Sequence, residues 1–143
     1  MKKILLFGSI FLCVTFSNAQ NIEFVSKIID YGTIDHNSDG NREFVFTNTG
    51  DKPLIIKSAK GSCGCTVPSY KKEDGSSEWA PGESGRIQVK YATNRIGNFK
   101  KTITLVTNTP DKKPVILTIK GNVLSPEEEV GAPDKENKGP IEN

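Results

Sequence analysis

Three segments of this chain, residues 86–91, 99–106 and 115–120, alternate between apolar and polar positions. Successive side chains of a β-strand point to opposite faces, so this period predicts strands with one buried and one exposed face. The second segment follows the alternation less cleanly than the other two. The apolar positions, which we expect to face inward, are Ile87, Val89, Tyr91, Phe99, Ile103, Leu105, Val115, Leu117 and Ile119.

Further strands are predicted where short apolar runs are bounded by Gly, Asn, Asp or Pro. These runs cover residues 22–25, 28–31, 43–47 and 54–57. Six or seven short strands in about 100 residues, with no apolar stripe of helical period, predict an all-β fold: an immunoglobulin-like two-sheet antiparallel sandwich. The disulfide of antibody domains is not expected, because Cys63 and Cys65 are near neighbours and Trp79 follows both.

The first 19 residues have the pattern of a secretory signal. Two lysines precede an apolar run at residues 4–14, and the segment ends in Ser17-Asn18-Ala19. The run is shorter than the ~20 residues that span a bilayer, and no second run follows. Cys13 follows Leu12 rather than the small residue that precedes a lipoprotein cysteine, so we expect a mature protein that begins at Gln20, without lipid. This predicts a periplasmic or secreted protein without a transmembrane segment.

The remaining chain divides into one domain and a tail. Residues 20–124 are enough for one domain, whereas residues 125–143 carry six acids, two lysines and almost no apolar residues, which predicts a disordered acidic tail. Removing the signal removes two lysines, so 19 basic and 17 acidic residues become 17 of each. This balance predicts no nucleic-acid partner, since such proteins carry a concentrated basic surface.

Several short motifs together resemble a known bacterial family. They are Asp30-Tyr31-Gly32-Thr33-Ile34, Phe44-Val45-Phe46-Thr47-Asn48-Thr49-Gly50, Pro53-Leu54-Ile55-Ile56, Ser62-Cys63-Gly64-Cys65-Thr66, Pro81-Gly82-Glu83 and Gly121-Asn122-Val123. The chain resembles, over residues 22–124, the exported family catalogued as domain of unknown function 1573, and the Cys-Gly-Cys-Thr box is the most specific match. The resemblance implies an exported protein with a sandwich similar to the PapD-like and major-sperm-protein-like folds, and it implies no activity.

The most informative candidate site is the pair Cys63 and Cys65, separated by Gly64. In a regular strand, residues i and i+2 lie about 6.5 to 7 Å apart at Cα, at the limit of disulfide reach, so a bond requires a bend at Gly64. Three interpretations remain open: structural or inert cysteines, a redox-active disulfide, and a pair of thiolates that binds a soft ion such as Cu(I). We place the box at a bend or strand end before Pro68, near the surface.

A second candidate lies in Asp35-His36-Asn37-Ser38-Asp39-Gly40, which matches the opening of a calcium loop with Asp35, Asn37 and Asp39 as ligands. Position 12 of such a loop requires a bidentate Glu, and the chain has Phe46 there. Asp39-Gly40 between two strand patterns favours a hairpin turn instead. His36, the single histidine, is expected to be a surface residue, and it cannot complete a two-cysteine, two-histidine zinc site.

No enzyme is predicted from these residues. A serine or threonine nucleophile needs a base within reach, and the single histidine stands in no recognisable triad order. We therefore expect a binding or assembly module whose partner is a protein or another component of the cell envelope. The alternative is a thiol redox or Cu(I)-handling protein that uses Cys63 and Cys65.

Overall fold

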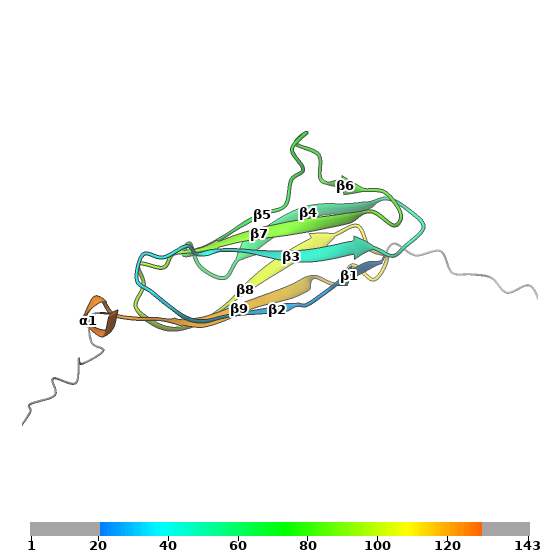
Figure 1. Cartoon of the computed structure of the whole chain (residues 1–143). Coiled ribbons are helices and arrows are strands. Elements are labelled where there is room, and N and C mark those ends of the chain that lie inside the picture. Colours follow the sequence, from blue (N-terminus) through cyan, green and yellow to red (C-terminus); the bar gives the residue numbers. More distant parts are fainter. Residues whose placement is uncertain (1–20, 130–143) are drawn as a thin grey trace, which may run out of the picture.

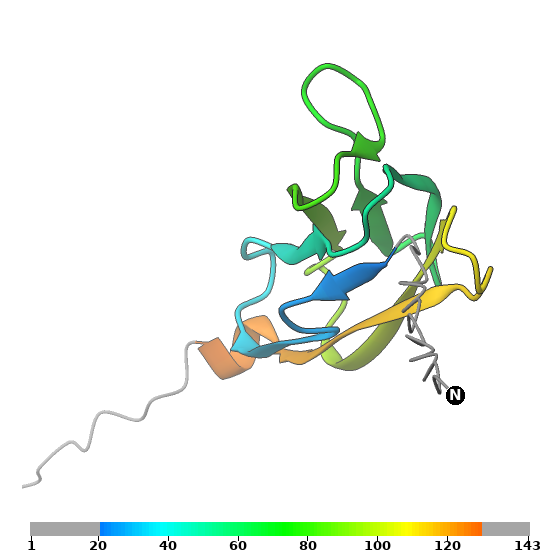
Figure 2. The same cartoon turned by 90° about the vertical axis from the view of Figure 1, so that its right-hand side faces the viewer.

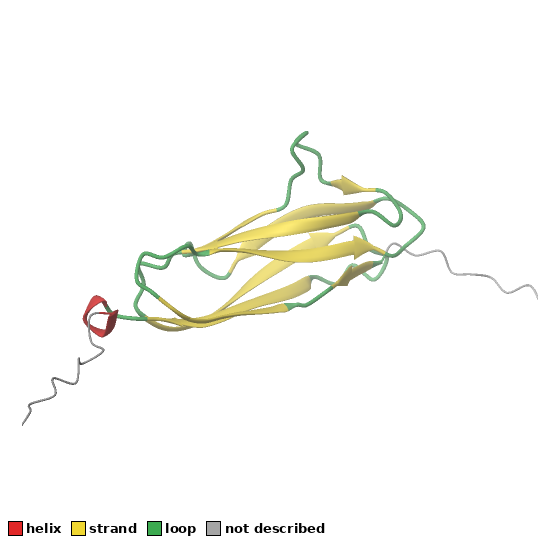
Figure 3. Ribbon diagram, viewed as in Figure 1, coloured by secondary structure: helices red, strands yellow, loops and turns green. Residues whose placement is uncertain are grey.

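The computed structural model describes residues 21–129. The predicted signal at residues 1–19 and residues 130–143 of the predicted tail lie outside this range. Within it the chain forms nine strands and one short helix (Figures 1 and 3). These are β1 (Ile22–Phe24), β2 (Ile28–Ile34), β3 (Asn41–Asn48), β4 (Leu54–Gly61), β5 (Thr66–Ser69), β6 (Glu78–Trp79), β7 (Ser84–Tyr91), β8 (Gly97–Thr107), β9 (Val115–Val123) and α1 (Pro126–Glu129).

The strands form two sheets that pack face to face (Figure 2). The four-stranded sheet has the order β1-β3-β7-β5, and the five-stranded sheet has the order β2-β9-β8-β4-β6. The predicted sandwich is confirmed, but one pair is not antiparallel, because β2 runs parallel to β9. The reason is that β1 and β2 form a first strand that changes sheets: β1 pairs with β3, and the chain then crosses to the free edge of β9.

Alternation along the strands places the core between the two sheets. All of the predicted inward residues are buried except Val115, which is half-buried where β9 begins. The indole of Trp79 packs edge-on against Phe46 with ring centroids 5.0 Å apart, and Tyr91 stacks on Phe99 at 3.9 Å. Contacts of this kind join residues of opposite sheets.

The predicted hairpin at Asp39-Gly40 is wrong. β2 and β3 belong to different sheets, so the segment between them is a crossover rather than a hairpin. The chain turns earlier, where the amide of Ser38 donates to the carbonyl of Asp35 and Asn37 has a positive φ of 59°. Glycine at position 40 instead allows the crossover to pass close to the backbone of β7, because a Cβ there would collide with the carbonyl oxygen of Tyr91.

Two strands were not predicted, and both lie at sheet edges. β5 contains Pro68, which has no amide to donate and is therefore tolerated at an edge. β6 has two residues and ends in Trp79. The predicted domain boundary at residue 124 falls just after β9, where the amide of Leu124 donates to the carbonyl of Ile34. The first residues of the acidic segment then form the single turn α1.

Candidate functional site

A disulfide joins Cys63 and Cys65, whose Cα atoms lie 5.3 Å apart. The bond lies in the turn that takes the chain from β4 in the five-stranded sheet to β5 in the four-stranded sheet. The Cα separation is shorter than a regular strand provides, as expected for a chain that bends at Gly64. The prediction that the box lies at a bend before Pro68 is confirmed.

Main-chain hydrogen bonds hold both ends of this turn. On one side the amide of Ser62 donates to the carbonyl of Thr102 on β8, at 2.8 Å. On the other side the amide of Ala92, just after β7, donates to the carbonyl of Cys65 at 2.9 Å. Each end of the turn is therefore hydrogen-bonded to one of the two sheets independently of the disulfide, so the backbone of the turn does not depend on the sulfur bridge.

The two sulfurs have different surroundings. Cys63 is half-buried, and Gly64 beside it is exposed with open space at its Cβ position. Cys65 retains only 5% of its surface and belongs to the hydrophobic core. The predicted surface location therefore holds for Cys63 and is wrong for Cys65, because Cys65 is the residue at which the chain re-enters the sandwich.

Thr66, the last residue of the Cys-Gly-Cys-Thr box, contacts both sulfurs. Its hydroxyl oxygen lies 3.8 Å from Sγ of Cys63 and 3.8 Å from Sγ of Cys65, and the residue is 3% exposed. Neither sulfur of a disulfide carries a proton, so the hydroxyl is the donor, and its one hydrogen is shared between the two sulfurs or given to one of them. The sequence places this threonine in the box but indicates no role for it, since its contacts depend on the turn.

The oxidised pair is chemically suited to thiol exchange. Two bonded sulfurs are not thiolates, so the Cu(I) interpretation would first require reduction of the disulfide. Within residues 21–129, no group of three or more His, Cys, Asp and Glu side chains lies close enough together to hold a metal ion.

The calcium candidates lie in the crossover between β2 and β3. The Asp39 carboxylate accepts hydrogen bonds from the main-chain and side-chain nitrogens of Asn41, and these bonds, the main-chain bond first, lower the pKa of Asp39. The Asn37 side-chain nitrogen lies 3.0 Å from Nδ1 of His36. These contacts stabilise the crossover itself, and they give the calcium interpretation of Asp35, Asn37 and Asp39 no support.

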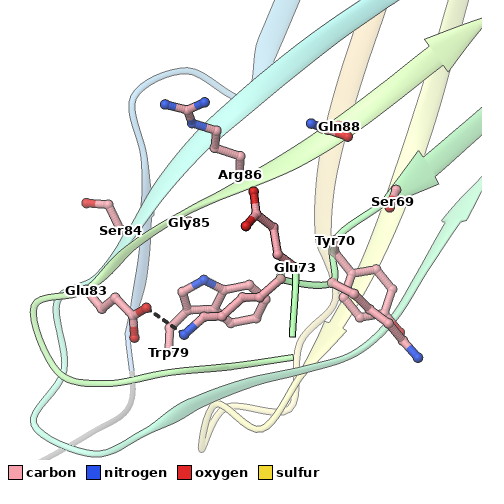
Figure 4. Close-up of a pocket in the computed structure, with 11 residues that line it drawn as sticks. Ser69, Tyr70, Glu73, Trp79, Glu83, Ser84, Gly85, Arg86 and Gln88 are labelled. Atoms are coloured by element: carbon pink, nitrogen blue, oxygen red, sulfur yellow. Dashed lines mark hydrogen bonds and ion pairs between the residues drawn. The ribbon is translucent and has the colours of Figure 1, made fainter. Parts of the chain in front are cut away.

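A surface pocket of about 450 Å³ lies beneath the loop between β5 and β6 (Figure 4). Lys72 Nζ bonds the Glu83 carboxylate at 2.5 Å and lies 5.5 Å from the centre of the Trp79 ring. The bond from Lys72, followed by one from the Ala80 amide, lowers the pKa of Glu83. The sequence holds no signal for this pocket, because its residues come from three separate segments and carry no common motif.

The chain belongs to the family described as "Protein of unknown function (DUF1573)", whose model matches residues 22–123. This confirms the resemblance carried by the motifs. A search of the curated proteins found no match. Among residues 21–129, no helix is long and apolar enough to cross a membrane.

Several solved structures share the fold. A Porphyromonas gingivalis W83 protein of unknown function matches with a TM-score of 0.62 and 16% identity, over 78% of this chain and 50% of that protein. The PapD-like domain 7 of human CEP192 matches with a TM-score of 0.58 and 12% identity, over 87% and 97%.

A third match is the Acinetobacter baumannii CsuC-CsuE complex, a chaperone with a pilus tip subunit before assembly. It has a TM-score of 0.52 and 10% identity, over 73% of this chain and 52% of the matched chain. This chain thus spans about half the length of the Porphyromonas gingivalis protein and of the matched Csu chain. At these identities the likeness shows the fold alone, a PapD-like, immunoglobulin-like sandwich.

Proposed function

We propose that this chain is an exported immunoglobulin-like module that binds a protein partner in the cell envelope. The observation that carries the proposal is a row of exposed apolar side chains on the outer face of the five-stranded sheet. Ile28 is 56% exposed, Ile116 46% and Val106 41%. Single exposed apolar residues are common on proteins, but a contiguous group of them marks an interaction surface.

Strand register places these three residues side by side. Ile116 on β9 pairs with Thr104 on β8, so Val106 is its diagonal neighbour. Ile28 on β2 pairs with Thr118, two residues along β9 from Ile116. Diagonal neighbours on one face of a sheet lie about 7 to 8 Å apart, within contact of a single partner surface. The row therefore crosses three adjacent strands.

The same face is rimmed by basic residues. Lys100 and Lys120 stand opposite each other on β8 and β9, and Lys60 on β4 pairs with Thr104. Asp30 joins Lys120 at 3.1 Å. An apolar row beside three lysines and one acid suits a protein with an apolar surface and acidic side chains at its edge.

The likeness to a chain of the Csu complex supports the class of partner, since that complex joins a chaperone to a tip adhesion subunit before assembly. Export is supported by the signal pattern of residues 1–19. We infer no catalytic role, because the single histidine stands in no recognisable triad order in the sequence, and the Glu83 carboxylate of the pocket accepts hydrogen bonds from Lys72 and from the Ala80 amide.

Site-specific photo-crosslinking in the producing cell tests this proposal. A crosslinker at Thr104, between Val106 and Lys60, should give one discrete adduct, and the second change Ile116→Asp should abolish it. The matched control carries the crosslinker at Gln88, which is exposed on the outer face of the four-stranded sheet. Equal adducts from both positions, or an adduct at Thr104 that survives Ile116→Asp, would contradict the proposal.

A second function is favoured by the partial exposure of Cys63. In this proposal the disulfide exchanges with thiols of other molecules in an oxidising compartment. The test is incubation of the purified oxidised protein with reduced glutathione, followed by acid quenching and mass spectrometry. Formation of a glutathione adduct supports exchange, and an unchanged disulfide over hours in excess glutathione contradicts it.

A further inference from the structure

We infer that thiol exchange at this site has a fixed direction: an incoming thiolate attacks Cys63, Cys65 leaves as the thiolate, and the Thr66 hydroxyl stabilises that leaving sulfur. This inference rests on the exchange function proposed above. It adds the sulfur that is attacked, the sulfur that leaves and a hydrogen-bond donor, so that Cys63, Cys65 and Thr66 each have a distinct role.

Access selects the sulfur that is attacked. Thiol exchange depends on which sulfur the incoming thiolate can reach. Cys63 is half-buried beside the exposed Gly64, whereas Cys65 retains 5% of its surface within the hydrophobic core. An incoming thiolate therefore approaches Cys63 from the side of Gly64, where no atom beyond residues 63–65 lies within 4 Å of the Cβ position.

The exchange step balances without a further reactant. A bond forms between the incoming sulfur and Sγ of Cys63, the bond between Cys63 and Cys65 breaks, and its electron pair passes to Sγ of Cys65. The incoming thiol is then held in a mixed disulfide. A second thiolate that attacks this mixed disulfide releases the Cys63 thiolate, leaves the two incoming thiols joined by a disulfide, and completes reduction of the site.

The Thr66 hydroxyl is placed for this step. It lies 3.8 Å from each sulfur and is buried, and its hydrogen-bond partners within residues 21–129 are these two sulfurs. A disulfide sulfur is a weak acceptor, so a buried hydroxyl is poorly satisfied in the oxidised state. A thiolate is charged, and hydrogen bonds to charged groups are about twice as strong. The hydroxyl therefore favours the state in which Cys65 carries the charge.

The position of the thiolate explains why a donor is needed. Burial in apolar surroundings raises the pKa of a thiol and makes its thiolate a poor leaving group. Cys65 packs in the hydrophobic core, and the hydrogen bond that its sulfur accepts comes from the Thr66 hydroxyl. The adjacent hydroxyl is the donor that the fold supplies, and the Ala92 amide holds the Cys65 backbone beside it.

Two variants separate the hydroxyl from the shape of the side chain. Thr66→Val has nearly the same volume and no hydroxyl, and Thr66→Ser keeps the hydroxyl. We expect the equilibrium with glutathione to shift about tenfold toward the oxidised form in Thr66→Val, the size of one hydrogen bond to a charged group. Thr66→Ser should stay within about threefold of the wild type, a smaller effect than loss of the bond. Melting temperatures of the oxidised proteins serve as the folding control.

The attacked sulfur is identified in the same samples. Fragmentation of the peptide that holds residues 61–71 separates Cys63 from Cys65 and locates the glutathione, which we expect on Cys63. Glutathione on Cys65, or equal equilibria in Thr66→Val and wild type, overturns the inference while exchange itself stands. Absence of an adduct in every protein, wild type included, contradicts the exchange function instead.

Discussion

The hydroxyl of Tyr31 donates a hydrogen bond of 2.9 Å to the carbonyl oxygen of Gly40, and this bond joins β2 to the crossover that leads into β3. The same oxygen accepts a second bond from the amide of Tyr91, at 3.0 Å. A single acceptor thus connects the five-stranded sheet, the crossover and the four-stranded sheet. It lies at the end of the sandwich where Cys65 bonds to Ala92.

Tyr31→Phe should lower the free energy of unfolding by about 1 kcal/mol at neutral pH, because the Gly40 oxygen keeps its bond from Tyr91 and is not left without a partner. Burial raises the pKa of Tyr31 to about 12, above its usual value of 10.0. The unfolded chain therefore releases this proton first, so the wild type loses stability as pH rises between these two values. Urea unfolding near the lower and the upper of these pH values should show a smaller loss of unfolding free energy in Tyr31→Phe than in the wild type.

Leu117→Ala should cost about 2 to 5 kcal/mol, because Leu117 is fully buried between the sheets. Ile116→Ala is the matched control, since Ile116 is the adjacent residue on the outer face, and its cost should be within about 0.5 kcal/mol. Chemical denaturation of both variants measures the difference. Similar losses at the two positions would mean that the outer face is covered in the free protein.

Replacing both Cys63 and Cys65 by alanine should cost less than about 3 kcal/mol. A bridge that closes a loop of three residues contributes about 1.6 kcal/mol through chain entropy, and the main-chain bonds of Ser62 and Cys65 still hold the turn. Thermal unfolding of the variant and of the reduced wild type should agree closely. Loss of folding in either protein would show that the bridge is structural.

Gly61→Ala should destabilise the protein by about 1 to 3 kcal/mol, because a Cβ at this position would collide with the carbonyl oxygen of Thr66, which cannot move without shifting β5. Gly64→Ala is the control, since nothing lies within 4 Å of its Cβ position. The two melting temperatures check this prediction. A loss at Gly64 as large as that at Gly61 would show that the bend itself needs glycine.

Glu83→Gln should lower stability at neutral pH and have little effect in strong acid. The bonds from Lys72 and from the Ala80 amide lower the pKa of Glu83 from its usual 4.5. A carboxyl whose pKa is lowered by folding stabilises the protein fully at pH values above its unfolded-state pKa. This stability is lost as pH falls through its folded-state pKa. Denaturant midpoints of variant and wild type should therefore converge as pH falls through the folded-state pKa of Glu83. A constant difference at all pH values would contradict the role of the charge.

Strands with a clean alternation of apolar and polar residues could be predicted from the sequence. One face of each such strand is buried, so every second residue is apolar. Residues 86–91 and 115–120 fall within β7 and β9, and Cys63 and Cys65 were recognised as a unit by their spacing. The two short edge strands could not be predicted. β5 contains a proline, and β6 has two residues that show no period.

The sequence by itself determined the β-sandwich class, the inward residues and the existence of one cysteine site, because local alternation and spacing carry that information. Only the tertiary structure decided that β2 and β3 lie in different sheets, that Cys65 is buried while Cys63 is accessible, and that Thr66 contacts both sulfurs. These features arise where the chain crosses between sheets. The turn of the box is held by residues distant in the chain, since Cys65 bonds to Ala92, 27 residues away, and Ser62 bonds to Thr102, 40 residues away, and no local pattern records such pairs.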